Sequence, residues 1–324
     1  MARNSNLSKA KKAKNDEFYT TKEEIEKELS HYKKFFEGQV VYCNCDDPAE
    51  SEFWKFFTRV FKDWKIKKLI ATHYEPNEKN YAYKLELNEG SNWADEPIKT
   101  PIACNGDFRN QICIDLLKEA DIVVTNPPFS LFRDFVAQLV EYDKKFLIIG
   151  NTNAVTYKEI FPLIKENKMW AGFSFNKTME FIMPDNYELK GKAFIDSEGK
   201  KHGFVPAIAW YTNLPIVKRQ QKLDLRGNYY SPDKYPKYDN YDAINCDKVA
   251  DIPCDYMGVM GVPITFIDHW CPEQFKIIGM AEDNGRGYSG AESKWDGLNP
   301  HCVINNKNKY KRIFIQRIKE KEEE

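Results

Sequence analysis

The sequence predicts an α/β fold, a parallel sheet with helices on both faces, followed by a smaller mixed α+β C-terminal domain. Short apolar runs alternate with amphipathic stretches between residues 40 and 168, a rhythm typical of such sheets. The rhythm ends near residue 175, and from Pro215 the chain is rich in Tyr, Pro, Asp and Lys without long helical periodicity. These observations predict a flexible basic arm at 1–15, an α/β domain at 16–214 and a second domain at 215–324.

The α/β domain is expected to begin with a turn and helix at 16–29, where Thr21 and Glu24 match a capping box and Ile25 and Leu29 share one helical face. Apolar runs predict strands at 40–43, 68–72, 101–104, 122–125 and 145–149. Helical spacing predicts helices at 50–64, 110–119, 131–141 and 157–168, the first with an aromatic stripe that packs in the core. The polar stretch 75–100 predicts an irregular excursion.

Beyond residue 175 the pattern changes from helices to hairpins. Residues 193–196 and 202–205 flank a Ser-Glu-Gly-Lys turn and predict a β-hairpin. Residues 206–212 predict one more strand of the sheet, so the boundary of the α/β domain is placed near residue 214.

The composition excludes several classes of protein. Hydrophobic residues are 42% and charged residues 30% of the 324, which is enough for a sizeable core. No apolar run approaches the roughly 18 residues of a membrane span, and the N-terminus lacks the apolar segment of a secretory signal. The eight cysteines include no C-x-x-C pair and the five histidines show no metal spacing, so we expect free thiols, no metal site and a cytoplasmic protein.

The overall charge gives little indication of a partner. The 48 basic and 49 acidic side chains sum to −1, whereas nucleic-acid-binding domains are often strongly basic. The first 14 residues nevertheless carry five basic side chains and no acid: Arg3, Lys9, Lys11, Lys12 and Lys14. Basic stretches are usually solvated surface, so the arm alone is weak support for DNA binding.

The most specific short motif is Asn126-Pro127-Pro128-Phe129, directly after the predicted strand 122–125. An α/β sheet places its ligand site at such a strand end. The two prolines make a stiff turn without N–H groups, which leaves the Asn126 side-chain oxygen and the Pro127 carbonyl as acceptors. With the flat face of Phe129 beside them, they suit a planar substrate bearing an amino group. An ordinary proline turn after a strand is the alternative.

This quartet resembles motif IV of the amino-methyltransferases, which use S-adenosylmethionine and hold the two hydrogens of the target amine with the Asn oxygen and the first Pro carbonyl. Residues 40–48, 122–133, 142–149 and 235–265 are similar to the EcoRI-type adenine-N6 DNA modification methylases. The resemblance runs from residue 11 to about 275 and again over 310–315. It implies a Rossmann-like methyltransferase sheet and, from the order of the motifs, a C-terminal target-recognition domain.

The same resemblance implies the residues that hold the cofactor. The segment Phe18, Tyr19 and Thr20 would close over its methionine end. The loop after the first strand stands in the place of motif I but has no glycine; its candidates are Cys43, Asn44, Asp46 and Asp47. Asp46 or Asp47 would bind the amino-acid ammonium, although both acids also suit the N-terminus of the following helix.

Two further strand ends complete the implied cofactor site. Glu75 would take the ribose hydroxyls, with Tyr74 against the adenine ring. Asp107 would accept from the cofactor's N6 amino group while the Phe108 N–H reaches N1, a segment that resembles motif III. An Asx-type turn is the alternative role for Asp107.

Contacts with DNA are expected from basic and aromatic side chains in the arm and in the second domain. The candidates are Lys9, Lys11, Lys12, Lys14, Lys218, Arg219, Lys222, Arg226, Tyr235, Lys237 and Tyr238. They would supply phosphate and groove contacts that help offset base extrusion, which costs a few kcal/mol. A small tyrosine-rich core with a solvated rim is the alternative.

The resemblance therefore implies a site-specific DNA methyltransferase that methylates adenine N6 in double-stranded DNA by base flipping, within a restriction-modification system and at a GAATTC-like site. It would act as a monomer near the bacterial nucleoid, bind no membrane and form no stable complex with a cognate endonuclease. Two alternatives stay open: the same chemistry on cytosine N4, RNA guanine N2 or protein glutamine, and a catalytically idle DNA-binding adaptor.

Overall fold

The computed structural model describes residues 18–45, 47–75, 82–90, 97–184, 187–229, 233–281 and 301–319. The chain divides into two compact units. The first comprises residues 1–152 and 171–214, and the second comprises residues 153–170 and 215–324. The second unit therefore resumes at residue 215, where the composition of the chain changes. It also includes residues 153–170, which the sequence pattern assigns to the α/β repeats.

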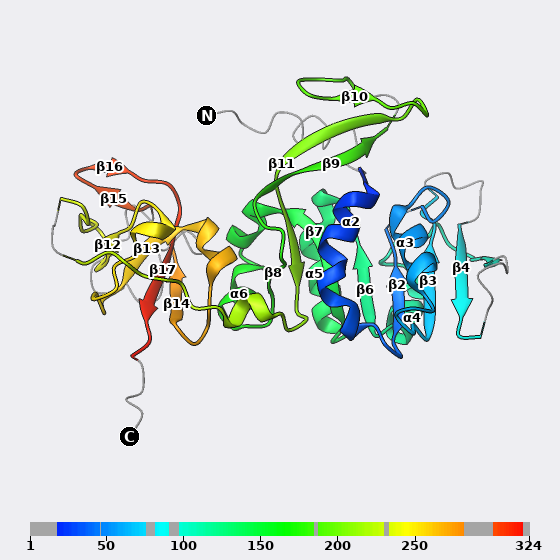
Figure 1. Ribbon diagram of the computed structural model, residues 1–324, viewed down its shortest axis with the longest axis horizontal. Helices are drawn as coiled ribbons and strands as arrows, with labels where there is room; N and C mark the ends of the chain where they lie inside the picture. The colour runs from blue at the N-terminus through cyan, green and yellow to red at the C-terminus, as the bar shows by residue number, and fades with distance from the viewer. Residues whose placement is uncertain are drawn as a thin grey trace. The chain divides into compact units, whose positions relative to one another are not determined.

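The first unit is built on a mixed sheet whose main path runs β1-β9-β11-β7-β6-β2-β3-β4-β5 (Figure 1). Its four central strands are parallel, because β2 pairs with β3 and β6, and β6 pairs with β7. These strands are β2 (Val40–Cys43), β3 (Lys68–Thr72), β6 (Ile122–Thr125) and β7 (Lys145–Asn151). Nearly every residue in them is buried, as expected of strands covered on both faces.

The outer strands are antiparallel, so the prediction of a parallel sheet is wrong at both edges. On one side the sheet continues into β4 (Tyr83–Asn88) and β5 (Ile98–Pro101). On the other side it continues into β11 (Lys201–Thr212), β9 (Lys177–Met183) and β1 (Tyr19–Thr20). Two short strands, β8 (Trp170–Ala171) and β10 (Phe194–Ile195), also pair with β11.

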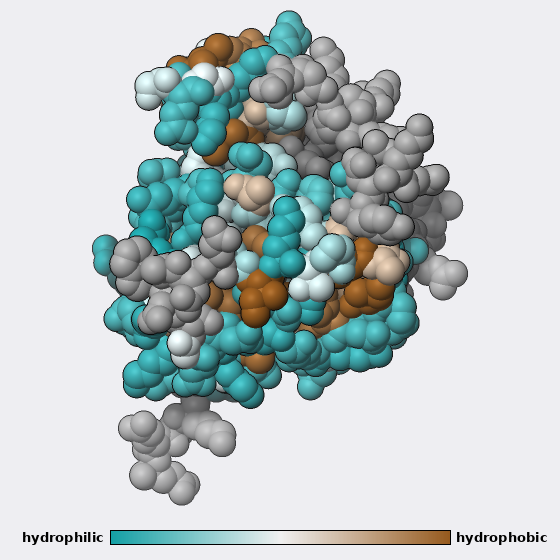
Figure 2. All heavy atoms as spheres, turned by 90° about the vertical axis from the view of Figure 1, so that its right-hand side faces the viewer, coloured by the Kyte–Doolittle hydropathy of each residue, from teal (hydrophilic) through white to brown (hydrophobic). Residues whose placement is uncertain are grey.

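The stretch 75–100, expected to be irregular, contains β4 and most of β5, and the strand expected at 101–104 ends at Pro101. Leu85 and Leu87 of β4 are buried between partly exposed residues, a period-two pattern that its charged side chains conceal in a search for apolar runs. Figure 2 views the molecule from the side of this edge, where the surface is mainly hydrophilic with small hydrophobic areas. A polar, short edge strand disfavours pairing with other chains.

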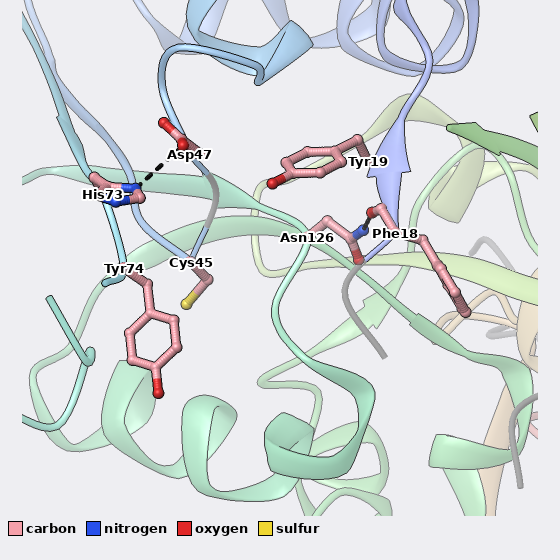
Figure 3. A pocket seen from close by; sticks show the side chains of 7 residues that line it. All are labelled: Phe18, Tyr19, Cys45, Asp47, His73, Tyr74 and Asn126. Atoms are coloured by element: carbon pink, nitrogen blue, oxygen red, sulfur yellow. Dashed lines mark hydrogen bonds and ion pairs between the residues drawn. The ribbon is translucent and has the colours of Figure 1, made fainter. Parts of the chain in front are cut away.

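Helices cover both faces of the sheet (Figures 1 and 3). The helical elements of this unit are α2 (Lys22–Leu29), η1 (Ser30–Phe35), α3 (Glu52–Val60), α4 (Gln111–Glu119), η2 (Phe129–Leu131) and α5 (Phe132–Glu141), whereas η3 (Thr152–Thr156) has only its first residue in it. The side chains of Ser51 and Asn110 cap α3 and α4. Thr21 occupies the N-cap of α2, but its hydroxyl donates to the carbonyl of Glu180, so the predicted capping box is wrong.

The second unit has a four-stranded sheet in the order β12-β13-β17-β14 and a two-stranded hairpin. Its elements are α6 (Phe161–Lys165), η4 (Val217–Gln220), β12 (Ile244–Asn245), η5 (Val249–Asp251), β13 (Met260–Pro263), η6 (Ile264–His269), β14 (Phe275–Met280), β15 (Val303–Ile304), β16 (Lys307–Asn308) and β17 (Arg312–Arg317). Tyr238, Tyr241 and Phe314 form the aromatic centre of its core. All eight cysteines are free. Over the described ranges, no helix has the length and apolarity of a membrane span.

Candidate active site

A pocket of about 440 Å³ opens in the first unit at the carboxyl ends of three parallel strands, β2, β3 and β6 (Figure 3). It is lined by Phe18, Tyr19, Cys45, Asp47, His73, Tyr74 and Asn126. Parallel sheets bind ligands at these ends, because the turns that follow the strands converge there. Five of these seven residues are site candidates predicted from the sequence, and Cys45 stands within the loop that resembles motif I. The seventh, His73, is not predicted by the sequence.

The end of β6 presents the most distinctive atom of the pocket. Asn126 follows the last residue of β6 and is only 8% exposed. Its Nδ2 donates to the carbonyl oxygen of Phe18 at 2.6 Å, which fixes the orientation of the amide. Its Oδ1 is buried and has no hydrogen-bond partner in the described part of the chain. A buried acceptor left unpaired costs about 1–3 kcal/mol, so this arrangement indicates a site kept ready for a donor.

The rest of the quartet turns the chain sharply after Asn126. Pro127 is buried and Pro128 half-buried, and the carbonyl of Pro128 accepts from the Leu131 N–H at 2.9 Å. Phe129 begins η2 and remains half-buried, with its ring edge-on to Phe18 at 6.4 Å between centroids. The quartet thus places an unpaired acceptor and a partly exposed aromatic ring a few residues apart on a stiff turn.

The segment Phe18–Thr20 lies against this turn. Strand β1 pairs with β9, and Phe18 packs on Phe181 and Tyr187. Tyr19 and Asn126 extend into the pocket from the same side (Figure 3). Thr20 is buried, and its Oγ1 has no hydrogen-bond partner among the residues described. The structure therefore brings this segment and the quartet together, while its contact with a cofactor remains a prediction.

The loop after β2 explains how a chain without glycine can make this turn. Cys45 has φ of +65°, in the left-handed region that glycine adopts most readily. Asn44 is buried, its carbonyl accepts from the Thr125 hydroxyl, and its Oδ1 has no partner in the described ranges. Cys43 ends β2 as a buried core residue. Asp46 lies outside the described residues.

Asp47 is the charged side chain of this loop within the described residues, and several groups contact it. Its Oδ1 accepts from the Ala49 N–H at 2.9 Å and from the Tyr83 hydroxyl at 3.0 Å, while its Oδ2 lies 3.2 Å from His73 Nδ1. Burial, with Asp47 adding to it, raises the pKa of Tyr83 to about 12. The cap of α3 is Ser51, so Asp47 organises a turn ahead of the helix and is not its N-cap.

The end of β3 supplies His73, Tyr74 and Glu75. Tyr74 lines the pocket and is 36% exposed, which leaves its ring accessible for stacking. Glu75 does not line the pocket directly; its N–H donates to the Asn105 carbonyl at 2.8 Å and its Oε2 lies 3.8 Å from His73 Nε2. The sequence does not predict His73 as a site residue, because the five histidines show no metal spacing. Its position immediately after a buried strand is a signal that could have identified it.

In the turn that resembles motif III, the local structure is the Asx turn that was the alternative role for Asp107. Asp107 accepts from the Arg109 N–H at 2.9 Å, an Asx turn, and both of its oxygens bond to the Arg109 guanidinium. This guanidinium holds the pKa of the Asp107 carboxyl below its usual value. Phe108 is buried against Phe135, and its carbonyl accepts from Gln138 Nε2 at 3.0 Å. Neither residue lines the pocket, and their cofactor contacts stay predictions.

The basic residues expected to bind DNA in the second unit differ widely in their surroundings. Lys218 forms an ion pair with Asp268. The Arg219 guanidinium carbon lies 4.0 Å from the Trp170 ring centroid and 5.2 Å from that of Trp270, and burial lowers the pKa of Arg219 to about 10. Arg219 therefore serves packing within the unit. Lys222, Arg226 and Lys237 are exposed, with Arg226 paired to Asp224.

The two tyrosines expected to contact DNA are core residues. Tyr235 is 1% exposed and Tyr238 is 5% exposed. Tyr238 donates to Asn245 Oδ1 at 2.7 Å and packs on Phe314, and burial raises the pKa of its hydroxyl. These side chains fit the alternative of a tyrosine-rich core with a solvated rim, because a buried ring has no surface to offer to a phosphate or a groove.

The arm lysines Lys9, Lys11, Lys12 and Lys14 lie outside the described residues. The described ranges contain no cluster of three or more His, Cys, Asp or Glu side chains suited to a metal ion. The candidate site is therefore built from hydrogen-bond acceptors, carboxylates and aromatic rings.

The sequence is similar to one family of known proteins. The sequence profile of the family described as adenine-specific methyltransferase EcoRI matches residues 6–318. The type II methyltransferase M.EcoRI of Escherichia coli is 46% identical over 98% of both chains. M.MpnI of Mycoplasma pneumoniae is 43% identical over 84% of both chains, and M.MgeORF184P of Mycoplasma genitalium is 38% identical over 96% of this chain and 98% of its own. No solved structure matches at significant similarity. This chain therefore belongs to the EcoRI family of adenine-specific methyltransferases.

Proposed function

We propose that the protein transfers a methyl group from S-adenosylmethionine to the N6 amino group of an adenine extruded from double-stranded DNA. The observation that carries this proposal is Asn126 Oδ1, a buried acceptor at a strand end with no partner in the described chain. The family is named for adenine-specific methyltransferases, and the matching relatives are type II methyltransferases. The protein would accordingly act as the modification enzyme of a restriction-modification system.

The chemistry rests on holding a weak nucleophile. The lone pair of an adenine amine is delocalised into the ring, so the nitrogen attacks poorly unless its geometry shifts towards tetrahedral. Asn126 Oδ1 would accept one amino hydrogen and the Pro127 carbonyl the other. The 2.6 Å bond from Asn126 Nδ2 to the Phe18 carbonyl keeps Oδ1 oriented before the substrate arrives. Acceptors fixed in advance stabilise the transition state without reorganisation.

The pocket fits a cofactor with a cationic amino acid and a ring. Two of the residues that line it suit such a ligand, since the carboxylate of Asp47 would face an ammonium and the ring of Tyr74 an adenine. When bound, S-adenosylmethionine supplies an electrophilic methyl group on its sulfonium. The protein's own residues orient that group and exclude water from it.

The DNA substrate must bring its target base out of the duplex. Extrusion costs a few kcal/mol, and stacking on an aromatic ring such as half-buried Phe129 returns about 1–3 kcal/mol. We assign target recognition to the second unit, whose exposed Lys222, Arg226 and Lys237 remain candidates for phosphate contacts. The arm at 1–14 would add phosphate contacts that hold the duplex without reading its sequence.

The test is methyl transfer from radiolabelled S-adenosylmethionine to duplex DNA, RNA and protein in parallel, followed by nucleoside analysis and mapping of the modified base. We expect label in duplex DNA as N6-methyladenine at one short sequence. Label in N4-methylcytosine, RNA or protein would contradict the acceptor that we propose. Binding of DNA and cofactor without any transfer would identify an idle adaptor instead.

A further inference from the structure

We propose that His73 is a positioning residue of the cofactor site, and that it holds the carboxylates of Asp47 and Glu75 in place for the ammonium and the ribose of the cofactor. The inference rests on the proposed function. Its basis is the geometry of the imidazole, whose two nitrogens each face a different carboxylate. Nδ1 lies 3.2 Å from Asp47 Oδ2, and Nε2 lies 3.8 Å from Glu75 Oε2 (Figure 3 shows the contact with Asp47).

The ring itself is fixed from a third side. Tyr83 of β4 stacks on His73 with 4.9 Å between ring centroids and an interplanar angle of 28°. The hydroxyl of the same tyrosine donates to Asp47 Oδ1 at 3.0 Å. Asp47 therefore accepts from the Tyr83 hydroxyl on one oxygen and lies beside His73 Nδ1 on the other, where the contact is a close approach and not a hydrogen bond, and the Tyr83 and His73 rings stack on each other. A carboxylate contacted in this way loses little rotamer freedom when a ligand binds, and such preorganisation favours affinity.

The backbone of His73 connects the same site to the turn at 105–108. The His73 N–H donates to the Tyr83 carbonyl at 2.9 Å, and the Glu75 N–H donates to the Asn105 carbonyl at 2.8 Å. Gly106, with φ of +79°, packs so closely on the His73 carbonyl that a Cβ there would collide with it. One residue thus links the loop after β2, the end of β3, strand β4 and the turn that resembles motif III.

This position has a matched comparison elsewhere in the first unit. His202 also lies between two carboxylates, with Nδ1 2.7 Å from Glu180 Oε1 and Nε2 3.0 Å from Asp196 Oδ2. Phe194 stacks on its ring at 4.7 Å, as Tyr83 does on His73. His202 does not line the pocket, and its two nitrogens form hydrogen bonds to their carboxylates, whereas the contacts of His73 are longer and not hydrogen-bonded. Substitutions at His202 therefore control for the general loss of a histidine between two acids.

The experiment measures the affinity for S-adenosylmethionine by calorimetry and kcat at saturating cofactor and DNA, in the full-length protein. His73→Phe keeps an aromatic ring on Tyr83 and removes both nitrogens. It should raise the cofactor Kd about tenfold or more, because both carboxylates lose the imidazole nitrogen that lies beside them and keeps them in place before the ligand binds, and should change kcat little. His73→Gln, which restores a donor, should recover part of the affinity. His202→Phe should bind the cofactor as the wild type does.

Several outcomes decide the inference. Wild-type affinity in His73→Phe, an effect on kcat without one on Kd, or an equal loss of affinity in His202→Phe would each overturn it. If His73→Phe does not give a cooperative thermal melt, Tyr83→Phe replaces it, since this variant removes only the hydroxyl bonded to Asp47 and should weaken cofactor binding in the same direction. Unchanged affinity there overturns the inference as well. A wild-type protein that binds no S-adenosylmethionine overturns the proposed function itself.

Discussion

The ends of two neighbouring parallel strands, β6 and β2, both line the pocket and are built differently. After β6, two prolines stiffen the turn and the buried Oδ1 of Asn126 is left without a partner in the described chain. After β2, the turn depends on a left-handed cysteine, and its carboxylate, Asp47, is contacted by Ala49, Tyr83 and His73. The end of β6 therefore presents an acceptor without a partner in the described chain, and the end of β2 presents a carboxylate that several groups contact.

This difference corresponds to a division of labour. An unpaired, rigid acceptor gains its partner only when the substrate arrives, so it acts on the transition state and on kcat. A carboxylate held by several donors keeps its charge and its place whether or not a ligand is bound, so it acts on affinity. The comparison predicts that substitutions on the β6 side change the rate and those on the β2 side change cofactor binding.

The largest expected effect is at Asn126. Asn126→Ala removes the acceptor and should lower the methylation rate by about 10²–10³, the usual cost of one preorganised polar contact in a reaction centre. Rapid-quench kinetics with radiolabelled cofactor measure the rate, and calorimetry should show nearly unchanged cofactor affinity. A rate like that of the wild type would remove Asn126 from the reaction.

A smaller effect is expected on the other side of the pocket. Asp47→Asn keeps the acceptor that bonds to the Ala49 N–H and removes the charge. It should weaken S-adenosylmethionine binding by about 1.5–3 kcal/mol, the range for hydrogen bonds to charged groups, while kcat at saturating cofactor stays near that of the wild type. Equal losses of affinity and kcat would show that the two strand ends do not divide the work.

Phe129 tests the β6 side without touching the cofactor. Phe129→Ala should weaken the extruded state by about 1–3 kcal/mol through lost base stacking, and Phe129→Tyr should be milder. A 2-aminopurine at the target position reports extrusion as a rise in fluorescence. The same rise and the same rate in the alanine variant would mean that Phe129 only packs against Phe18.

The smallest expected effect concerns the backbone of the β2 loop. Cys45→Gly should raise the free energy of unfolding by up to about 1 kcal/mol, because glycine removes a left-handed strain of about 1–2 kcal/mol while adding flexibility to the unfolded chain. Cys45→Val is the matched opposite and should destabilise the protein, since β-branched residues adopt positive φ poorly. Chemical denaturation measures both. A glycine variant less stable than the wild type would refute the strain.

Much of the first unit could be predicted because its central strands are continuous apolar runs. The predicted bounds of β2, β3 and β6 agree with the structure, and the quartet falls at a strand end as expected. The edge strand β4 was missed because charged residues alternate with its buried leucines, and β5 was missed because it is short and mostly exposed, without an apolar run. Because β4 was not predicted, the hydrogen bond from Tyr83 to Asp47 and the stacking of Tyr83 on His73 were not predicted either. Both contacts join segments far apart in the sequence.

The second unit shows where residue type alone is insufficient. Lysine, arginine and tyrosine suggested DNA contacts, but Tyr235 and Tyr238 are buried and Arg219 lies between two tryptophan rings. Without regular periodicity, nothing in the sequence separates a tyrosine of the core from one on the surface. Likewise, the sequence gives no sign of the positive φ at Cys45 in the motif I loop, because cysteine rarely adopts this conformation.

The most direct test of the central claim is a double-mutant cycle between Asn126 and the amino group of the target. Wild type and Asn126→Ala are each titrated with duplex DNA carrying adenine or purine at the mapped target position, with a cofactor analogue present. We predict that removing the amino group weakens binding by the wild type more than binding by the variant, which loses only the contact with the Pro127 carbonyl, with a coupling of about 0.5–1.5 kcal/mol, as for one neutral hydrogen bond. Equal losses in both proteins, and so no coupling, would contradict the claim that Asn126 holds the amine.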